Sequence, residues 1–324
     1  MQKKVPVLIT WDVDPDSYIR SELRRRTVDQ ALDLCQQVGV RSTFFITAKV
    51  DHLSPRQMER LGEHEVGCHG LTHWIDEEYN RMPVAMQRTY IEEATRRLEE
   101  MFATPIKSFR SPRVKTSGQT LKLLSDYGYM VDSSVCSQRI DFISSNMINP
   151  GWIVAPRRPY HPHRDSAFKR GDLPIWEVPV SAMVLPFISA SMRAFGLAFM
   201  KMFFRLLYAE SRRSGKPIVY LAHTTEFVAT SKPHIKLRHF SPSFIRTHGF
   251  LPRNALYRMD GKACLKATGE LLTHMASYPD VAFMTVSQYA NQYLRAKPLH
   301  DDEQAMQTDC LAEERCLVTE RGSF

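Results

Sequence analysis

Two pairs of polar residues follow apolar runs near the start of this sequence. Asp12 and Asp14 close the run VLITWDVD, and a second run, EVGCHGLTH, ends in His69 and His73. Alternate residues of a strand point to one face, so both carboxylates can face the same cavity. Two imidazoles four residues apart can bind one metal ion from a turn. Together these groups are typical of a divalent metal site with a spare base, which lets water attack an amide or ester near neutral pH.

Three further polar residues follow predicted strands. Arg110, in SFRSP, can hold a carboxylate through a bidentate pair or make a surface salt bridge. Asp132, after YMV, can orient a histidine or cap a turn. His223 closes PIVYLAH and can be the general acid to a leaving amine, or a satisfied core histidine. For the first two pairs, the alternatives are an Asx turn before Pro15 and a chance spacing of surface histidines.

Strand-like runs alternate with helical runs along most of the chain. Strands are predicted at 5–11, 42–48, 65–70, 106–112, 129–135, 176–181, 217–223 and 281–286. Helices are predicted at 28–38, 86–101 and 117–128, the first and last of them ending at glycine. This alternation predicts a parallel sheet with helices outside it, and seven or eight strands favour a closed (β/α) barrel. Active residues of such barrels lie at the carboxyl ends of strands, where the polar residues above all fall.

One barrel domain is predicted over residues 1–297, with an elaborated region at 138–210. The tail at 298–324 is acidic and is predicted to be disordered. It carries seven acidic and two basic residues, a net −5 in a chain of net charge +8, which leaves about +13 on the barrel. That charge favours anionic partners such as phosphates or lipid head groups. No nucleic-acid module is present, and none of the six cysteines lies in a CxxC pair, which predicts free thiols.

The N-terminus enters a short apolar run at once, with no small-residue cleavage site after it. We therefore expect no secretory signal and a cytoplasmic protein. The apolar segment 186–208 carries Arg193, Lys201 and Arg205, which fall on one side of a helix of 3.6 residues per turn. Three cations argue against a full membrane span. The segment suits peripheral association with the inner face of a membrane, or a helix packed on the barrel whose cationic side chains reach solvent.

Six short motifs, in this order along the chain, resemble the polysaccharide deacetylase (NodB-homology) family. They are TWDVD, STFFIT, HGLTH, FRSP, VDSS and YLAH, and the likeness runs from about Val5 to Tyr293. The family's usual first motif has two adjacent aspartates, whereas Val13 separates them here. That spacing resembles a subgroup with Asp-x-Asp and His-Gly-x-x-His motifs. The resemblance implies a distorted (β/α) barrel of about seven strands and a metal-dependent amide hydrolase.

The resemblance also implies a role for each matching residue. Asp12 would be the general base and His223 the general acid, with Arg110 orienting Asp12. The metal ligands would be Asp14, His69 and His73. Asp132 matches the family's fourth motif, but Val135 follows where the family usually has a tryptophan. We therefore count Asp132 among the catalytic candidates without a defined role.

The expected metal is zinc, although Co²⁺, Ni²⁺, Fe²⁺ or Mn²⁺ would suit the same ligands. The predicted function is removal of an N-acyl group, above all N-acetyl, from an amino sugar in a glycan or glycolipid precursor of the cell envelope. A phosphate-bearing carrier, nucleotide or lipid, suits the basic barrel, and the segment RRPYHPHR (157–164) can supply phosphate contacts with His161 and His163 at the rim. The alternatives are a deformylase of a lipid-phosphate-linked amino sugar, a hydrolase of another amide, and a catalytically silent barrel that binds glycan or membrane.

Overall fold

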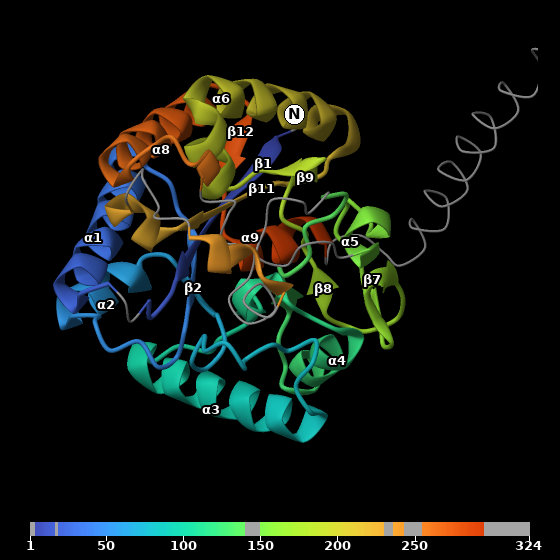
Figure 1. Cartoon of the computed structure of the whole chain (residues 1–324). Helices are drawn as coiled ribbons and strands as arrows, with labels where there is room; N and C mark the ends of the chain where they lie inside the picture. Colours follow the sequence, from blue (N-terminus) through green and yellow to red (C-terminus); the bar gives the residue numbers. More distant parts are fainter. Residues whose placement is uncertain (1–3, 17–18, 140–149, 230–235, 243–254, 295–324) are drawn as a thin grey trace, which may run out of the picture. The chain divides into compact units, whose positions relative to one another are not determined.

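The computed structural model describes residues 4–16, 19–139, 150–229, 236–242 and 255–294 (Figure 1). The chain divides into two compact units, residues 1–287 and 288–324. The described part of the second unit contains the end of α9 (Val286–Tyr289) and the π-helical turn η5 (Ala290–Leu294). The sheet and the candidate site lie in the first unit. The predicted acidic tail, 298–324, lies outside the described residues.

Seven parallel strands form one sheet in the order β11-β1-β2-β3-β4-β5-β8, and an eighth strand, β12, also pairs with β1 (Figure 1). Their bounds are β1 Val5–Val13, β2 Thr43–Ile46, β3 Glu65–Cys68, β4 Ser108–Phe109, β5 Val131–Asp132, β8 Trp176–Glu177, β11 Ile218–His223 and β12 Val281–Phe283. Each strand overlaps one of the eight predicted strand segments. The predicted parallel architecture is confirmed.

An irregular segment joins the two ends of this sheet. After β8 the chain passes beside β11, where the Ser181 N–H donates to the Val219 carbonyl at 3.1 Å. Further along, the Leu221 N–H donates to the Phe187 carbonyl at 3.3 Å, and one parallel bridge pairs Ile188 with Leu221. The (β/α) barrel is therefore distorted, because these separate contacts replace a regular ladder between β8 and β11.

Strand β1 pairs with three others, β11, β2 and β12, and all nine of its residues are buried. A parallel strand covered on both faces reads as a near-continuous apolar run, which is why VPVLITWDV carries little alternation. Trp11 stacks on Phe44 of the neighbouring strand at a centroid distance of 6.1 Å, and meets Phe227 edge-on at 6.0 Å. Burial around β1 fixes the direction in which the aspartates at its end can point.

Helices surround the sheet, and the three that the periodicity predicts are present (Figure 1). The longer helices are α1 Ser21–Val38, α2 Pro55–Gly62, α3 Val84–Phe102, α4 Gly118–Asp126, α6 Ser189–Ser214 and α8 Gly261–Ala276. Neither α2 nor α8 was predicted. The apolar periodicity did not reveal α2 because its short sequence is mostly polar. A capping box marks its start, with Ser54 Oγ accepting a hydrogen bond from the Gln57 N–H at 3.3 Å. The turns after strands include η1 Pro112–Val114, η2 Thr224–Val228 and η3 Leu237–Phe240.

The first part of the elaborated region, residues 138–175, contains a short helix and short strands where it is described. It holds α5 (Pro150–Val154) and an antiparallel pair, β6 (Pro162–His163) with β7 (Ser166–Arg170). A second short antiparallel pair, β9 (Ala182–Met183) with β10 (Leu185–Pro186), leads into α6. Strands of two to five residues are too short for a periodic pattern to reveal. The four described cysteines form no disulfide with one another, and all four are buried.

A kink at Gly196 (φ 88°) divides α6. Arg193 lies before the kink and is buried, with its guanidinium 4.2 Å from the centre of the Tyr257 ring. The prediction that Arg193 shares a helix face with Lys201 and Arg205 is therefore wrong, because the kink changes the rotation between them. No described helix is both long and apolar enough to cross a membrane.

Candidate active site

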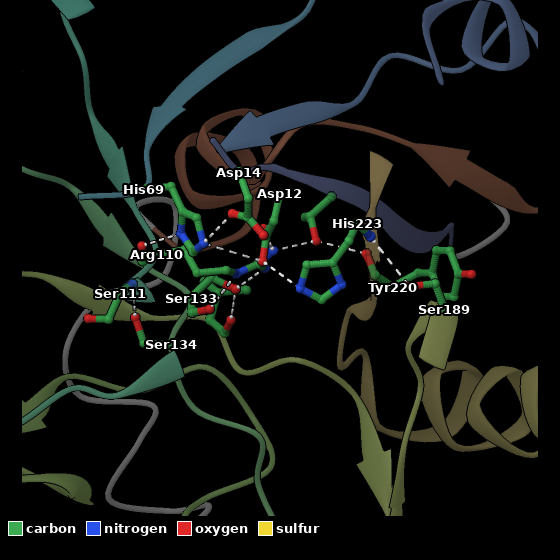
Figure 2. Close-up of polar contacts among 12 residues, drawn as sticks. Asp12, Asp14, His69, Arg110, Ser111, Ser133, Ser134, Ser189, Tyr220 and His223 are labelled. Carbon is green, nitrogen blue, oxygen red and sulfur yellow. Dashed lines mark hydrogen bonds and ion pairs between the residues drawn. The ribbon is translucent and has the colours of Figure 1, made fainter. Parts of the chain in front are cut away.

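The polar residues at the ends of β1, β3, β4 and β11 meet at one edge of the sheet. Figure 2 shows Asp12 and Asp14 between His69 and His223. The register explains this meeting, since Asp12 pairs with His223 across β1 and β11. His69 directly follows β3, the strand beside β2. Parallel strands bring their carboxyl ends to the same edge, as the sequence predicts.

Three of these residues form a cluster suited to a metal ion. The side chains of Asp14, His69 and His73 offer ligand atoms that all lie within 4.8 Å of one another. Asp14 Oδ1 is 3.4 Å from His69 Nε2 and 3.6 Å from His73 Nε2. The same Oδ1 atom is buried and accepts no hydrogen bond from the described residues. A buried carboxylate oxygen facing two imidazole nitrogens fits a divalent cation.

The orientation of His69 supports the same assignment. Its Nδ1 lies 2.7 Å from the Arg110 carbonyl, which can only accept, so Nδ1 carries the proton. The lone pair is then on Nε2, the atom that faces Asp14. A histidine ligand in a metal site is held in this way, with its second nitrogen donating to a carbonyl or carboxylate.

The loop that carries His73 is organised by a residue that the sequence analysis missed. The Glu77 carboxylate accepts hydrogen bonds from three backbone N–H groups and one hydroxyl of residues 71–73, each at 2.7 Å. The Tyr79 hydroxyl donates to it at 3.1 Å. At Gly70, with φ +77°, an added Cβ would lie 2.5 Å from Glu77 Oε1, so this turn needs glycine. His73 itself has φ +57°, a conformation that the Glu77 contacts sustain.

Arg110 holds Asp12 in place through a hydrogen-bonded ion pair. Its Nη1 donates to Asp12 Oδ1 at 2.8 Å and to Thr10 Oγ1 at 2.9 Å. Its other nitrogens donate to the Ser133 carbonyl and hydroxyl, and its guanidinium lies 4.3 Å from the centre of the Phe45 ring. Arg110 is fully buried. The expected bidentate pair with Asp12 is therefore not formed, because Ser133 occupies the remaining donors.

The second oxygen of Asp12 faces two imidazoles. Asp12 Oδ2 lies 3.8 Å from His69 Nε2 and 3.8 Å from His223 Nε2. His223 is one-third exposed, and on its far side Nδ1 is 3.8 Å from Glu226 Oε1. Glu226 had no predicted role, because the only hint in the sequence is that it lies three residues after His223. The arrangement places a carboxylate on each side of the His223 ring.

Burial and neighbouring charges set the protonation of the cluster. Burial alone would raise the pKa of the Asp14 carboxyl, but the imidazoles of His73 and His69 outweigh it and hold this pKa below its ordinary value. Burial would lower the pKa of His69, but the Asp12 and Asp14 carboxylates raise it. Burial lowers the pKa of His73. An ionised carboxylate and a neutral imidazole are the forms that bind metal.

Asp132 lies apart from this cluster. Its Oδ1 accepts from the Ser134 hydroxyl at 2.8 Å, and its other close partner is Glu177, its register neighbour on β8. No ion pair or hydrogen bond joins Asp132 to the aspartates and histidines described above. Burial raises the pKa of Asp132, and burial together with the Asp132 carboxylate raises the pKa of Glu177 well above its ordinary value. The burial of the two neighbouring carboxyls therefore favours their protonated forms.

The predicted rim residues have other contacts. His161 Nδ1 lies 2.8 Å from the Leu173 carbonyl, and its ring packs against Trp176. His163 is partly exposed beside Asp165. Of the arginines at 157–164, Arg157 pairs with Glu210 at 2.7 Å and Arg164 pairs with Asp172 at 2.7 Å. This segment thus has fewer free cations than its sequence suggests.

Comparison with known proteins connects the cluster to a family. The family model described as polysaccharide deacetylase matches residues 1–131. No curated protein matches the chain significantly. Among solved structures, a Mycobacterium smegmatis protein described as a polysaccharide deacetylase has a TM-score of 0.59 and 18% identity, over 92% of this chain and 93% of its own.

Two further structures have the same fold. A Pseudomonas aeruginosa PAO1 protein, also described as a polysaccharide deacetylase, has a TM-score of 0.56 and 14% identity, over 92% of this chain and 93% of its own. The Puue allantoinase has a TM-score of 0.56 and 14% identity, over 90% of this chain and 92% of its own. The distorted (β/α) barrel is thus shared along the chain. Residues 1–131, which hold the clustered aspartates, the two histidines and Arg110, match the polysaccharide deacetylase family model, which spans less than half of the chain.

Proposed function

We propose that this protein is a metal-dependent hydrolase that removes an N-acetyl group from an amino sugar. The observation that carries the proposal is the position of Asp12. Arg110 holds its Oδ1, and its Oδ2 faces both His69, a candidate ligand, and His223, a candidate acid. A base and an acid beside a three-residue ligand set are what amide hydrolysis requires.

Each residue of the cluster has its own role in the proposed reaction. A divalent metal held by Asp14, His69 and His73 would polarise the acyl carbonyl and lower the pKa of water at the site. Asp12 Oδ2 takes the proton of the attacking water, while Arg110 keeps the carboxylate from rotating away. His223 Nε2 then gives a proton to the departing amine, and the Glu226 carboxylate, 3.8 Å from Nδ1, stabilises the charged ring electrostatically. Three ligands leave positions open, as a catalytic site requires.

The finer proposal concerns the metal and the substrate. Zinc suits one carboxylate and two imidazoles in a buried site. The net charge of about +13 on residues 1–297 supports a phosphate-bearing carrier of the sugar, nucleotide or lipid. Deformylation of a lipid-phosphate-linked amino sugar needs the same residues and is the second candidate. The inner face of a membrane, as the place where such a carrier is used, stays a prediction.

The test begins with metal content and hydrolysis by the pure protein. Stoichiometric metal and loss of acetyl from sugar-nucleotides or sugar-phospholipids, followed by mass spectrometry, support the proposal. Loss of formyl instead would establish the second candidate. A protein without stoichiometric metal would favour a silent barrel that binds glycan.

The assigned roles are tested by Asp12→Asn and His223→Ala with metal still bound. We expect each to lower kcat by about 10²- to 10⁴-fold, since each removes one proton-transfer group. Matched controls are Asp29→Asn and Asp126→Asn, which change partly exposed acids on α1 and α4 away from the cluster. If the Asp12 and His223 variants hydrolyse as fast as these controls, the assignment fails.

A further inference from the structure

The outer face of α6 is apolar where a surface helix is normally polar. Met202 and Leu206 are each 51% exposed, four residues apart on one face. Phe195 is 43% exposed and its ring lies 5.1 Å from that of Phe199, which continues the same line across the Gly196 kink. We refer to Phe195, Phe199, Met202 and Leu206 as the α6 stripe.

The inner face of the same helix packs on the core through Met200, Phe203, Phe204 and Leu207, which are buried. Phe199 of the stripe is partly buried and also packs against the core. Figure 1 shows α6 beside α8 on the outside of the sheet, with α1 next to α8. The apolar surface that this packing leaves exposed comes from Phe195, Met202 and Leu206. Within the described part of the chain, Met202 and Leu206 remain half exposed.

Cations accompany the stripe on the side of α8. A cleft of about 860 Å³ between α1, α6 and α8 is lined by four cationic side chains: Arg26, Lys201, Lys262 and Lys266. Its two acids already have partners, since Asp33 pairs with Arg60 at 2.7 Å and Glu270 with Lys266 at 3.9 Å. No described acid forms an ion pair with the other three cations. The cleft thus presents uncompensated positive charge next to exposed apolar side chains.

The charge of α6 itself points the same way. Its only acid is Glu210, which already pairs with Arg157 and Lys216. Arg205 is exposed one turn after Lys201 and completes a cationic edge along the stripe. A second copy of this chain would bring a like net charge, +8, toward that edge. An anionic surface with an apolar interior complements both features.

The helix also begins at the candidate active site. Ser189, the first residue of α6, accepts a hydrogen bond on its Oγ from the His223 N–H at 3.3 Å. Phe195, where the stripe begins, follows six residues later. A surface on which the stripe rests would therefore lie close to the edge of the sheet that carries the catalytic candidates.

We propose that the α6 stripe and the cationic cleft dock this protein on a membrane rich in anionic phospholipid. In this arrangement α6 lies in the interfacial plane, its apolar side chains enter the acyl boundary, and the cations contact phosphate head groups. Docking does not depend on the reaction that the active site performs. It would, however, bring a lipid-linked amide to the site by diffusion in two dimensions.

The experiment is co-sedimentation of the full chain with vesicles of phosphatidylglycerol and of phosphatidylcholine, without substrate. We expect binding to phosphatidylglycerol that weakens as salt rises, and little binding to phosphatidylcholine. The pair Met202→Glu and Leu206→Glu should weaken binding by at least about tenfold. Lys201→Gln and Lys262→Gln should each weaken it by about fivefold.

Two controls separate docking from folding and from catalysis. Val154→Glu introduces the same charge at a 69% exposed valine on α5 and should bind vesicles as the wild type does. Asp12→Asn should also bind normally, so a wrong reaction assignment leaves this result unchanged. Metal content and far-UV circular dichroism check that the α6 variants fold.

Three outcomes would overturn the proposal. They are no binding of the wild type to phosphatidylglycerol at low salt, equal binding to both lipids, and wild-type binding by the Met202 and Leu206 variants. Loss of a dimer in those variants, with vesicle binding unchanged, would instead assign the stripe to self-association.

Discussion

Two buried pairs of carboxylates end strands of the same sheet, yet their surroundings differ. Asp12 and Asp14, at β1, face a guanidinium and imidazole rings. Asp132, at β5, has another acid, Glu177, and a serine hydroxyl as its close partners, and the charge of Arg110 acts on it without a hydrogen bond. The first pair can be charged in a buried site because cationic or metal-binding partners compensate it. The second can stay buried only by holding a proton.

The contrast predicts that position at a strand end does not by itself make a carboxylate catalytic. Neighbouring strands decide which groups face it. Beside β1 the neighbours supply His223 and, through β3 and β4, His69 and Arg110. Beside β5 the neighbour β8 supplies Glu177, and the hydrogen bonds of the Arg110 guanidinium after β4 go to Asp12, Thr10 and Ser133 and not to Asp132. Variants of the two pairs should therefore fail in different ways.

The largest expected difference concerns metal binding. Asp14→Asn removes a candidate ligand and should lower metal affinity by more than about a hundredfold, beyond the usual loss for an outer-shell change. Asp132→Asn should retain stoichiometric metal and stay within about tenfold of the wild-type kcat, since Asp132 contacts none of the ligands. Metal titration and hydrolysis rates measure both. If Asp14→Asn and Asp132→Asn lose metal equally, the proposed difference between the two carboxylate pairs is wrong.

A smaller effect is expected one step away from the ligands. Glu77→Gln removes a charged acceptor from the loop that holds His73 and adds an amide donor near backbone N–H groups. Metal affinity should fall by about 10- to 100-fold, with kcat at saturating metal changed less. Glu78→Gln, next in sequence, is the matched control, because Glu78 pairs with Arg113 and Lys115 outside the cluster. If both substitutions have the same effect on affinity, Glu77 is not the positioning residue.

The smallest effect concerns stability and pH. The pKa of Glu177 is raised in the folded chain, so the native state binds more protons than the unfolded state. Its stabilising contribution is complete below the ordinary glutamate pKa, and is lost as pH rises toward the folded pKa. Glu177→Gln should flatten that decline, whose slope for one group is at most about 1.4 kcal/mol per pH unit.

Urea unfolding of the metal-loaded protein between pH 5 and pH 8 measures this slope. Glu270→Gln, which removes a partly exposed acid on α8, is the control and should follow the wild type. A Glu177→Gln protein that loses as much stability over this range as the control does would show that Glu177 is already ionised.

The sequence was sufficient where chemistry follows a regular strand. Asp12, Asp14 and His69 stand at strand ends, so the period of two and the parallel topology predict their meeting. The role of Glu77 could not be predicted, because its carboxylate meets the backbone N–H groups of residues 71–73 only after the loop has turned at Gly70. The pairing of Asp132 with Glu177 could not be predicted either, because the two are neighbours by strand register and lie far apart in the sequence.

Helix α6 illustrates a different limit. A uniform helical period places Arg193 on one side with Lys201 and Arg205, but the backbone at Gly196 interrupts that period. Arg193 then reaches Tyr257 and is buried, while Arg205 stays exposed. A single glycine with positive φ can therefore reverse the predicted exposure of a side chain several residues away.

Arg110 contributes two different groups to the two halves of the site. Its carbonyl orients His69, and its guanidinium holds Asp12. A small displacement of β4 would thus move His69, a candidate ligand, and Asp12, the candidate base, in the same direction. The distance between Asp12 and His69 would therefore change little when β4 moves, because both side chains move with Arg110. Substitution of the Arg110 side chain would remove one anchor and leave the other, since every residue at this position keeps the carbonyl.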